Sequence, residues 1–459
     1  MKRNHLLTRL LGAAALLLAT ACTPSDGNTS ASDPSQPGKN RPQRPAAYRP
    51  AAPKAPLLSP GLEQVNGQAF AGAGLSGKNV KIGIIDAGFS RANQDPSLAH
   101  LFKQHRVLGG KDYIYPAAQD LYANRSDMDW HGTSVWRYIG GKDNINQYGL
   151  AHGAAFFLAR TDNGTREFAA EQEYFRQALG WLHAQGVRLV HTSLGYAYGF
   201  DNPGENYVPE NMDGKSTLIT KAVQEAITRY NMIVVVSAGN DGNNPWKVVS
   251  APADSEGVIT VGAADRQGAK QDFSSEGPDF LPYLKPNVSC LNATGGTSFS
   301  APVITSLVAC LLEKKPDLSS RKVRELLEKS AHLYPYGNNY LGYGVPDAGR
   351  MLTLLDNPDH DFGRAERLQT RDSLVTIALG KGSGQATLFH KKDKWVVLKQ
   401  EQARAANQSL TVRRPSGLKR TKLVVDDKTQ SKYHTEEHPE KVRFTTVSTP
   451  EKVIEISWQ

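Results

Sequence analysis

The chain is poor in cysteine and lacks any dense block of positive charge. Only three cysteines occur among 459 residues. The net charge of +9 is spread along the chain, so we expect no nucleic-acid partner. There is no long internal repeat. The composition, with 39% hydrophobic and 22% charged residues, is that of a globular protein and excludes a disordered or fibrous class.

The apolar run at the N-terminus is too short to span a membrane. Residues 10–21 consist mostly of Leu and Ala and follow Lys and Arg side chains, a pattern that predicts a signal peptide over residues 1–21. The run ends in LATAC, which resembles the lipobox of bacterial lipoproteins. We therefore expect Cys22 to be lipid-modified, to begin the mature chain and to anchor it in a membrane. The alternative is cleavage at a plain small-residue site.

The expected location is the cell envelope, where the lipid anchor would hold the protein at the outer membrane or the cell surface. An exported protein can form disulfides, so a bridge between Cys290 and Cys310 is one interpretation of the remaining cysteines. Cys310 lies within an apolar helical pattern, which favours the other interpretation, a buried thiol that acts as a small hydrophobic side chain.

Proline marks off the first segment of the chain. Residues 23–60 hold nine of the 26 prolines and almost no large apolar side chain. Such a segment buries too little surface to offset its ordering entropy, so we expect a disordered tether from Cys22 to residue 60. The pattern of apolar residues changes at residue 60 and again after residue 356, which predicts folded domains over 61–356 and 357–459.

Residues 61–356 alternate between continuous apolar segments and amphipathic ones. Short β-branched runs separated by helical patterns predict a mainly parallel sheet with helices on both faces, an α/β doubly wound fold. In such sheets functional residues gather at the carboxyl ends of the strands. The expected strands are 80–85, 187–195, 232–237 and 257–263, and the expected helices are 171–185, 216–230, 302–313 and 320–330.

Residues 357–459 consist of short, often alternating stretches separated by turn residues. This spacing predicts a small C-terminal antiparallel β-sandwich domain. The domain lacks an aromatic cluster that would form a sugar-binding platform, so glycan or partner binding by this domain is the weaker hypothesis. We expect Trp395 and Trp458 to lie in the core.

Three polar residues stand where a strand ends or a helix begins: Asp86, His131 and Ser298. Taken singly, each has an ordinary structural interpretation, as a cap, a buried histidine and a helix start. Taken together they suit one mechanism, because serine becomes a nucleophile when an imidazole removes its proton and a carboxylate orients that imidazole. The chain order Asp, His, Ser is one of the known orders for this arrangement.

A fourth polar residue suits the same chemistry. Asn240 follows the apolar strand 232–237 and stands between glycines. Its side-chain amide, together with a backbone N–H at a helix N-terminus, would stabilise the oxyanion of a tetrahedral intermediate.

Four motifs in this order resemble those of the subtilases, the subtilisin-like serine proteases of peptidase family S8. They read IIDAGF, HGTSV, SAGNDG and GTSFSAP. The similarity extends over about residues 62–355 and includes lesser landmarks such as SLGY and GYGVPDA. It suggests the variant found in lipoproteins and secreted proteins of Bacteroidetes-type bacteria.

The resemblance implies a role for each motif residue. Ser298 would be the nucleophile, His131 the general base and then acid, and Asp86 the orienting carboxylate. Asn240 and the backbone N–H of Ser298 would form the oxyanion hole.

The resemblance also implies where the substrate binds. By this analogy Ser193, Leu194 and Gly195 would form an edge strand that pairs with an extended peptide. Ala238 and Gly239, next to Asn240, would line one wall of the pocket for the side chain that precedes the cut bond.

The sequence departs from the family pattern at several points. Phe299 stands where many members have methionine, and Ser134 stands where many have histidine. The stretch 196–214 is longer than in compact members, a length at which it could overhang the substrate cleft. Residues 23–60 are too short and too rich in proline to form the inhibitory pro-domain of many subtilases. Folding then proceeds without one or with help from the C-terminal domain.

We therefore predict a serine endopeptidase that hydrolyses peptide bonds through an acyl-enzyme intermediate. The alternative is a catalytically inactive member of the same fold that binds partners at the cell surface, and the intact motifs favour activity. We expect a monomer that acts on proteins or peptides and needs no cofactor for its chemistry. Family members often bind a structural calcium ion, but no acidic loop cluster locates one here, and no metal ligand is assigned.

Overall fold

The structure is a computed structural model, and it describes residues 56–292, 295–379, 384–425 and 433–459. The expected signal peptide, Cys22 and nearly all of the expected tether lie outside the described residues. The chain from Lys54 to Gln459 forms one compact unit, so the domain boundary expected after residue 356 stays a prediction. We call residues 61–356 the α/β region and residues 357–459 the C-terminal region.

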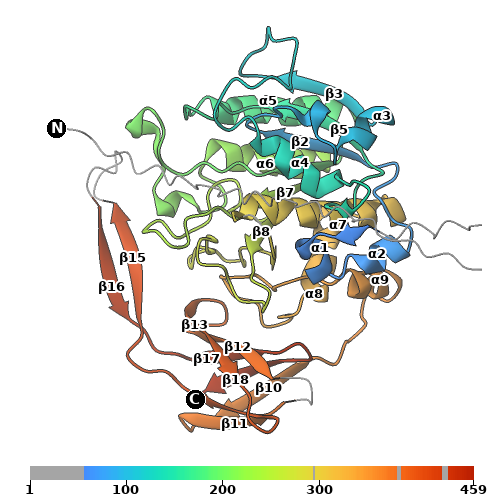
Figure 1. The fold of residues 1–459 in the computed structure, drawn as a ribbon. Helices are drawn as coiled ribbons and strands as arrows, with labels where there is room; N and C mark the ends of the chain where they lie inside the picture. Colours follow the sequence, from blue (N-terminus) through green and yellow to red (C-terminus); the bar gives the residue numbers. More distant parts are fainter. Residues whose placement is uncertain (1–55, 293–294, 380–383, 426–432) are drawn as a thin grey trace, which may run out of the picture. The chain divides into compact units, whose positions relative to one another are not determined.

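A seven-stranded parallel sheet lies at the centre of the α/β region (Figure 1). Its strand order is β3-β5-β2-β6-β7-β8-β9. β7 reads IVVVS and is buried throughout, as expected of a strand that is covered on both faces. The strands are β2 (Lys81–Asp86), β3 (Val107–Asp112), β5 (Ala155–Arg160), β6 (Leu189–Thr192), β7 (Ile233–Ser237), β8 (Ile259–Ala263) and β9 (Val288–Cys290).

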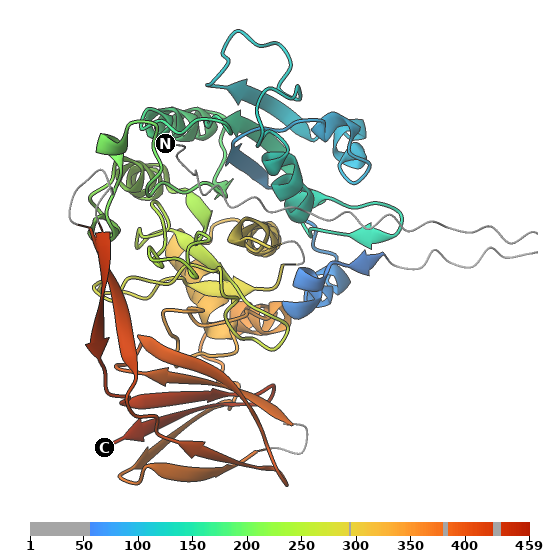
Figure 2. The same cartoon turned by 60° about the vertical axis from the view of Figure 1, so that its left-hand side comes forward.

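Helices cover both faces of this sheet (Figure 2). α5 and α6 pack on one face, whereas α4, α7 and α8 pack on the other. α7 is buried along most of its length, which suits its almost wholly apolar sequence. No helix within the described ranges has the length and apolar character needed to cross a membrane. The longer helices are α4 (His131–Gly140), α5 (Glu171–Ala184), α6 (Leu218–Tyr230), α7 (Ala301–Lys314), α8 (Ser320–Ser330) and α9 (Ala348–Asp356), and the short ones are α1 (Pro60–Gln64), α2 (Gln68–Gly72) and α3 (Ala99–Lys103).

The doubly wound α/β fold predicted from the sequence is confirmed. The four predicted strands correspond to β2, β6, β7 and β8, and the four predicted helices correspond to α5, α6, α7 and α8. The prediction did not include β3, β5 and β9. β3 carries two adjacent glycines, β5 lacks β-branched residues and β9 has only three residues, so none of them has a clear strand pattern.

The fold begins a few residues before the expected end of the tether. β1 (Leu57–Leu58) pairs in parallel with β4 (Asn146–Gln147), and the Leu57 N–H donates to Ile145 O over 2.7 Å. α1 then begins at Pro60, a position where the missing proline N–H costs nothing. Residues 57–60 therefore belong to the folded unit.

The strands of the central sheet all end at one edge, which is where the polar motif residues gather. β2 ends at Asp86, and β6 ends at Thr192, directly before the SLGY stretch. β7 ends at Ser237, shortly before Asn240. Because these strands run parallel, segments far apart in the sequence meet along this carboxyl edge.

The C-terminal region has two packed layers of strands, but they are not all antiparallel. Ile377 and Val412 of one layer share a core with Trp458 of the other, while Trp395 is only partly buried. The prediction of an antiparallel sandwich is wrong at β10, which pairs with β18 in parallel. No hairpin turn joins these two strands, so nothing imposes the antiparallel direction. One layer has the order β10-β18-β17-β12-β13 and the other pairs β11 with β14.

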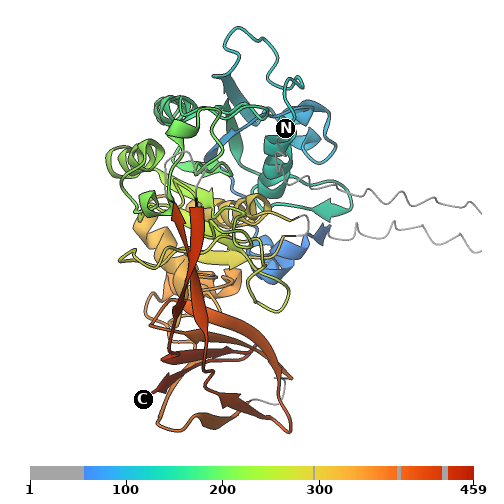
Figure 3. The same cartoon turned by 90° about the vertical axis from the view of Figure 1, so that its left-hand side faces the viewer.

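The strands of this region are β10 (Ala365–Thr370), β11 (Leu374–Ala378), β12 (Gln385–Lys391), β13 (Val397–Arg404), β14 (Ser409–Arg413), β15 (Lys419–Val425), β16 (Tyr433–Pro439), β17 (Phe444–Ser448) and β18 (Val453–Trp458). β15 and β16 form a separate ribbon (Figure 3). Lys422 of this ribbon lies 3.3 Å from Glu210 in the 196–214 stretch. The sheet itself is tied to the α/β region where the Val397 N–H donates to Asn339 Oδ1 over 2.9 Å.

Cys290 and Cys310 are both buried free thiols. The structure therefore contains no bridge between them, and it agrees with the interpretation of Cys310 as a small hydrophobic side chain in α7. Cys290 Sγ also donates to the Ser300 carbonyl over 3.3 Å, which ties β9 to the start of α7.

The buried ion pair of the C-terminal sheet leads to a stability prediction. Lys391 Nζ lies 2.6 Å from Glu455 Oε2, with side chains 0% and 9% exposed. Lys391→Met should lower the free energy of unfolding by about 3–5 kcal/mol, because Glu455 would stay buried without its cationic partner. Urea unfolding measures this. Lys399→Met, which removes a half-exposed lysine paired with Glu401, is the control and should cost about 1 kcal/mol at most; equal effects would contradict the account.

Candidate active site

Asp86 and His131 form a buried hydrogen bond at the carboxyl edge of the sheet. Asp86 is the last residue of β2 and is 0% exposed, and His131 is the first residue of α4. Asp86 Oδ1 lies 2.7 Å from His131 Nδ1 and also accepts the Ala87 N–H over 2.8 Å. Because an ionised carboxylate can only accept, Nδ1–H is the donor. The Nε2 atom of the neutral imidazole is then left with a free lone pair.

Opposing effects set the pKa of His131. Burial alone would lower it, but the charge of Asp86, its hydrogen bond and the charge of Asp162 outweigh burial and raise the pKa above 6.5. Asp162 is itself buried just beyond β5, and this burial raises its pKa to about 6. The Tyr196 hydroxyl donates to Asp162 over 2.6 Å.

A buried ion pair fixes the segment that leads into α4. Arg160 Nη2, at the end of β5, lies 2.6 Å from Asp129 Oδ1, and both side chains are almost fully buried. The backbone carbonyl of Asp129 accepts the Ser90 N–H over 2.7 Å, which ties this segment to the loop after Asp86. Contacts from the end of β5 and from the loop after β2 therefore fix the position of the backbone just before His131.

Ser298 lies in a short 3-10 turn, η4 (Thr297–Phe299), directly before α7. Gly295 and Gly296 precede it with φ of 77° and 93°, values that favour glycine. Pro302 lies in the first turn of α7, as the sequence predicted.

The turn places Ser298 next to the histidine without joining the two residues. The ring of Phe299 lies against the imidazole of His131, with ring centroids 5.8 Å apart. Ser298 is 7% exposed, and within the described residues its hydroxyl makes no hydrogen bond. In serine enzymes the hydrogen bond between the nucleophilic hydroxyl and the histidine is often long when no substrate is bound, and it shortens in the complex with substrate.

Thr297 orients the side-chain amide of Asn240. The Thr297 N–H donates to Asn240 Oδ1 over 2.8 Å, and Thr297 Oγ1 donates to the same oxygen over 3.2 Å. With Oδ1 occupied as an acceptor, the Nδ2 group of Asn240 points away from Thr297. Asn240 is exposed, so its amide donor is available beside the Ser298 turn.

The SLGY stretch presents free backbone groups at its third residue. Gly195 is exposed, and among the described residues its N–H and C=O have no hydrogen-bond partner. Ser193 is buried and Leu194 is half-buried, so these two residues are packed against the rest of the protein. Gly195 therefore offers backbone groups with which another strand can pair.

Ala238 and Gly239 connect β7 to Asn240 and are not equally accessible. Ala238 is fully buried, and its N–H donates to Val261 O over 2.9 Å. Gly239 is half-buried with φ of 104°, and its N–H donates to Thr297 Oγ1 over 3.1 Å. Only Gly239 of this predicted pair therefore has surface to offer to a ligand.

The long stretch 196–214 packs beside the loop that carries Asn240. Phe200 and Met212 are buried in the core on the α5–α6 side of the sheet. The Tyr198 hydroxyl donates to Asp241 Oδ1 over 2.7 Å. The stretch is thus anchored at both ends and borders the site.

Residues that sequence analysis did not single out support the site. His191 is buried, with Nε2 2.9 Å from Ser193 Oγ and Nδ1 2.8 Å from Thr305 Oγ1 of α7. Ser193 Oγ donates to the Ser298 carbonyl over 3.1 Å. Burial lowers the pKa of His191 to about 3, so it is neutral. Polar residues within otherwise apolar runs were the available signal, because buried polar groups need partners.

No three or more His, Cys, Asp or Glu side chains in the described ranges are placed together to hold a metal ion. The structure therefore locates no calcium site. The geometry described above is a carboxylate–imidazole pair, a neighbouring serine turn and an oriented amide, which are the elements of nucleophilic acyl transfer.

Comparison with known proteins agrees with this geometry. The model of the subtilase family matches residues 77–344, which is more than half of the chain. Subtilisin E of Bacillus subtilis is 26% identical over 295 residues, which cover 62% of this chain and 68% of that protein. The subtilisin of Bacillus pumilus is also 26% identical over 295 residues, 62% of this chain and 95% of that protein.

A solved structure supports the fold. The Clostridium perfringens CspB protease matches with a TM-score of 0.52 and 15% identity, over 65% of this chain and 99% of that chain. The chain belongs to the subtilase family. It is a subtilisin-like serine endopeptidase, and its substrates are proteins or peptides.

The Asp86–His131 pair leads to a pH prediction. In Asp86→Asn the pKa of His131 should fall below 6.5, because burial remains and the larger of the two opposing charges is lost, leaving only the smaller effect of Asp162. An NMR titration of the histidine rings measures it. Asp162→Asn is the control and should lower the pKa less.

The same shift has a consequence for stability. Because the folded pKa of His131 lies above its unfolded value, this group stabilises the native protein at acidic pH, and the contribution disappears as pH rises through the folded pKa. An unchanged His131 pKa in Asp86→Asn would contradict the electrostatic account.

Proposed function

We propose that Asp86, His131 and Ser298 act as the catalytic triad of this endopeptidase. The observation that carries the proposal is the buried 2.7 Å hydrogen bond between Asp86 and His131, because it leaves the Nε2 lone pair free to accept a proton. His131 removes the Ser298 proton as the hydroxyl attacks the scissile carbonyl, and later gives that proton to the leaving amine. Asp86 orients the imidazolium that forms in between and stabilises it.

Asn240 and the Ser298 backbone N–H act as the oxyanion hole in this proposal. The support is the orientation of Asn240, whose Oδ1 is held by Thr297 while its amide donor stays accessible. Donors that are fixed in advance do not need to reorganise when charge develops on the carbonyl oxygen.

We also propose that an extended substrate pairs with the backbone at Gly195. Its N–H and C=O are the groups that a strand in the cleft would use. An added Cβ at this position would lie 2.3 Å from Ser250 Oγ, so a side chain would disturb the wall behind the substrate. Gly239 contributes to the wall of the pocket for the residue before the cut bond.

An inactive surface-binding protein is the alternative function. Nothing in the geometry favours it, because the oriented amide of Asn240 and the buried charge of Asp86 have no purpose in a pure binding protein. A buried carboxylate is costly to fold and needs its partners.

We further propose that the enzyme is anchored to the bacterial cell envelope through lipid-modified Cys22, as in the lipoprotein variant of the family. The support is the sequence alone: the apolar run of residues 10–21, the LATAC stretch and the proline-rich segment that follows. The segment would hold the peptidase at a distance from the membrane.

The triad proposal is tested by steady-state hydrolysis of a fluorogenic peptide library. Ser298→Ala and His131→Ala should each lower kcat by about five to six orders of magnitude, because triad residues act as a unit. Asn240→Ala should lower kcat by about two to three orders, the effect of one oxyanion donor.

Ser134→Ala is the matched control for these variants. It removes a hydroxyl from α4, close to His131, and should leave kcat essentially unchanged. The proposal is wrong if Ser298→Ala keeps a kcat close to that of the wild type, or if Ser134→Ala loses as much activity as Ser298→Ala.

The anchor is tested by metabolic labelling with an alkyne fatty acid in a bacterial host, followed by detergent phase separation. The wild-type protein should carry the label and enter the detergent phase, whereas Cys22→Ala should do neither, because no other cysteine lies next to a signal peptide. Cys290→Ala controls for the loss of a thiol and should remain labelled. A wild-type protein that takes no label contradicts the anchor.

A further inference from the structure

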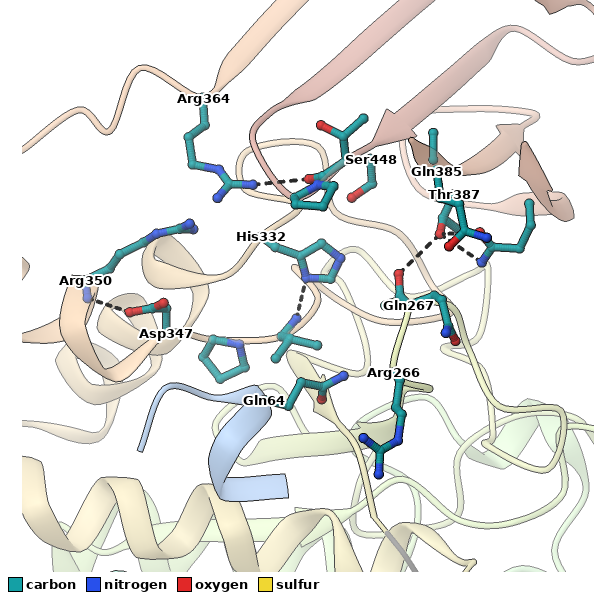
Figure 4. A pocket seen from close by; sticks show the side chains of 17 residues that line it. Gln64, Arg266, Gln267, His332, Asp347, Arg350, Arg364, Gln385, Thr387 and Ser448 are labelled. Atoms are coloured by element: carbon teal, nitrogen blue, oxygen red, sulfur yellow. Dashed lines mark hydrogen bonds between the residues drawn. The ribbon is translucent and has the colours of Figure 1, made fainter. Parts of the chain in front are cut away.

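A cavity of about 480 Å³ lies where the C-terminal sheet meets the α/β region (Figure 4). Its walls come from both regions. The α/β region contributes His332, Asp347 and Arg350, and the C-terminal region contributes Arg364 and Thr387. No residue of the candidate triad lines it.

His332 has a buried donor without a partner. Its Nδ1 atom accepts the Val345 N–H over 2.8 Å, so in the neutral ring the proton is on Nε2. Nε2 is buried, and it has no hydrogen-bond partner among the described residues. Gly268 and Gly344 pack closely on the His332 ring. A Cβ added at either glycine would lie within 3.0 Å of a ring atom. The ring is therefore held in place with an unused N–H.

Arg364 adds a second unused donor and a positive charge. Its Nε atom is buried and has no partner within the described ranges. Its Nη2 group makes only a long 3.4 Å hydrogen bond to the Thr449 carbonyl. Burial and the neighbouring charge of Arg350 lower the pKa of Arg364 to about 10, so it stays charged at neutral pH.

Arg350 lies on the same side of the cavity, and Figure 4 shows both guanidinium groups near the His332 ring. No ion pair among the described residues joins Arg350 or Arg364 to a carboxylate. Among the described lining residues Asp347 is the one carboxylate, and its charge partly opposes the effect of burial on the pKa of both arginines. Its Oδ1 atom is occupied as the cap of α9, where it accepts the Arg350 backbone N–H over 2.9 Å and Asn66 Nδ2 over 3.0 Å.

We propose that this cavity is a binding site for a small oxyanion, a phosphate or a carboxylate. Two like charges line the cavity, beside two N–H donors that have no partner among the described residues. An acceptor-only anion would hydrogen-bond to the guanidinium groups and offset the repulsion between the arginines. Buried donors without partners are rare in native proteins, which is why they point to a missing ligand. Because the walls come from both regions, a bound anion would also tie the C-terminal sheet to the α/β region.

The test is a titration of the full-length protein with inorganic phosphate and, separately, citrate, with sodium chloride adjusted to hold ionic strength constant. Calorimetry should show saturable binding, and the Tm should rise with anion concentration because the ligand binds the folded state. Arg364→Gln and Arg350→Gln should each weaken binding by at least about tenfold, the effect of losing a charged hydrogen bond. Arg413→Gln, an exposed arginine on β14, should change nothing.

The two anions distinguish the chemistry of the ligand, since tighter binding of phosphate identifies a phosphate group and tighter binding of citrate identifies carboxylates. The proposal is overturned if neither anion binds saturably, or if Arg364→Gln and Arg350→Gln bind as well as the wild type. Should Arg364→Gln fail to fold, Arg350→Gln decides the question alone, because it lies on a different element.

Discussion

The hydrogen bond between Asp86 and His131 is the interaction on which the rest of the site depends. An ionised carboxylate with no exposed surface is costly to bury, and its stability requires partners that are fixed in place. The pairing with His131 Nδ1 meets that requirement and at the same time sets the tautomer of the imidazole. The bond that stabilises Asp86 therefore also leaves the Nε2 atom of His131 free to accept a proton.

The parallel sheet brings the other elements to this pair. Asp86 ends β2, the SLGY stretch and Asn240 come after the next two strands, and the turn before α7 brings Ser298 to the same edge. Cross-links between these segments then fix their positions, through Ser193 to the Ser298 carbonyl and through Thr297 to Asn240. These links are side-chain to backbone contacts, which tolerate little movement of the chains that they join.

Much of this could be predicted from the sequence, and the failures have physical reasons. The β-branched runs and the four motifs carry strong local patterns, so the sequence predicts the parallel α/β fold and identifies Asp86, His131, Ser298 and Asn240 as candidate site residues. The partnership of Arg160 with Asp129 was missed, because it joins two segments whose patterns are unrelated and only the fold brings them together. The parallel pairing of β10 with β18 was missed for the same reason. Because no hairpin joins the two strands, their relative direction is set by the tertiary packing and not by the local sequence.

Whether Asp86, His131 and Ser298 form one working site can be measured by the reaction of the folded protein with a fluorophosphonate. Such a reagent modifies a serine only when a base has activated it, so mass spectrometry reads the state of the site without any knowledge of the substrate. The account predicts one adduct per chain, on the peptide that contains Ser298, and loss of the adduct when His131 is replaced. A well-folded protein that takes no adduct, or one that takes it on another serine, would contradict the account.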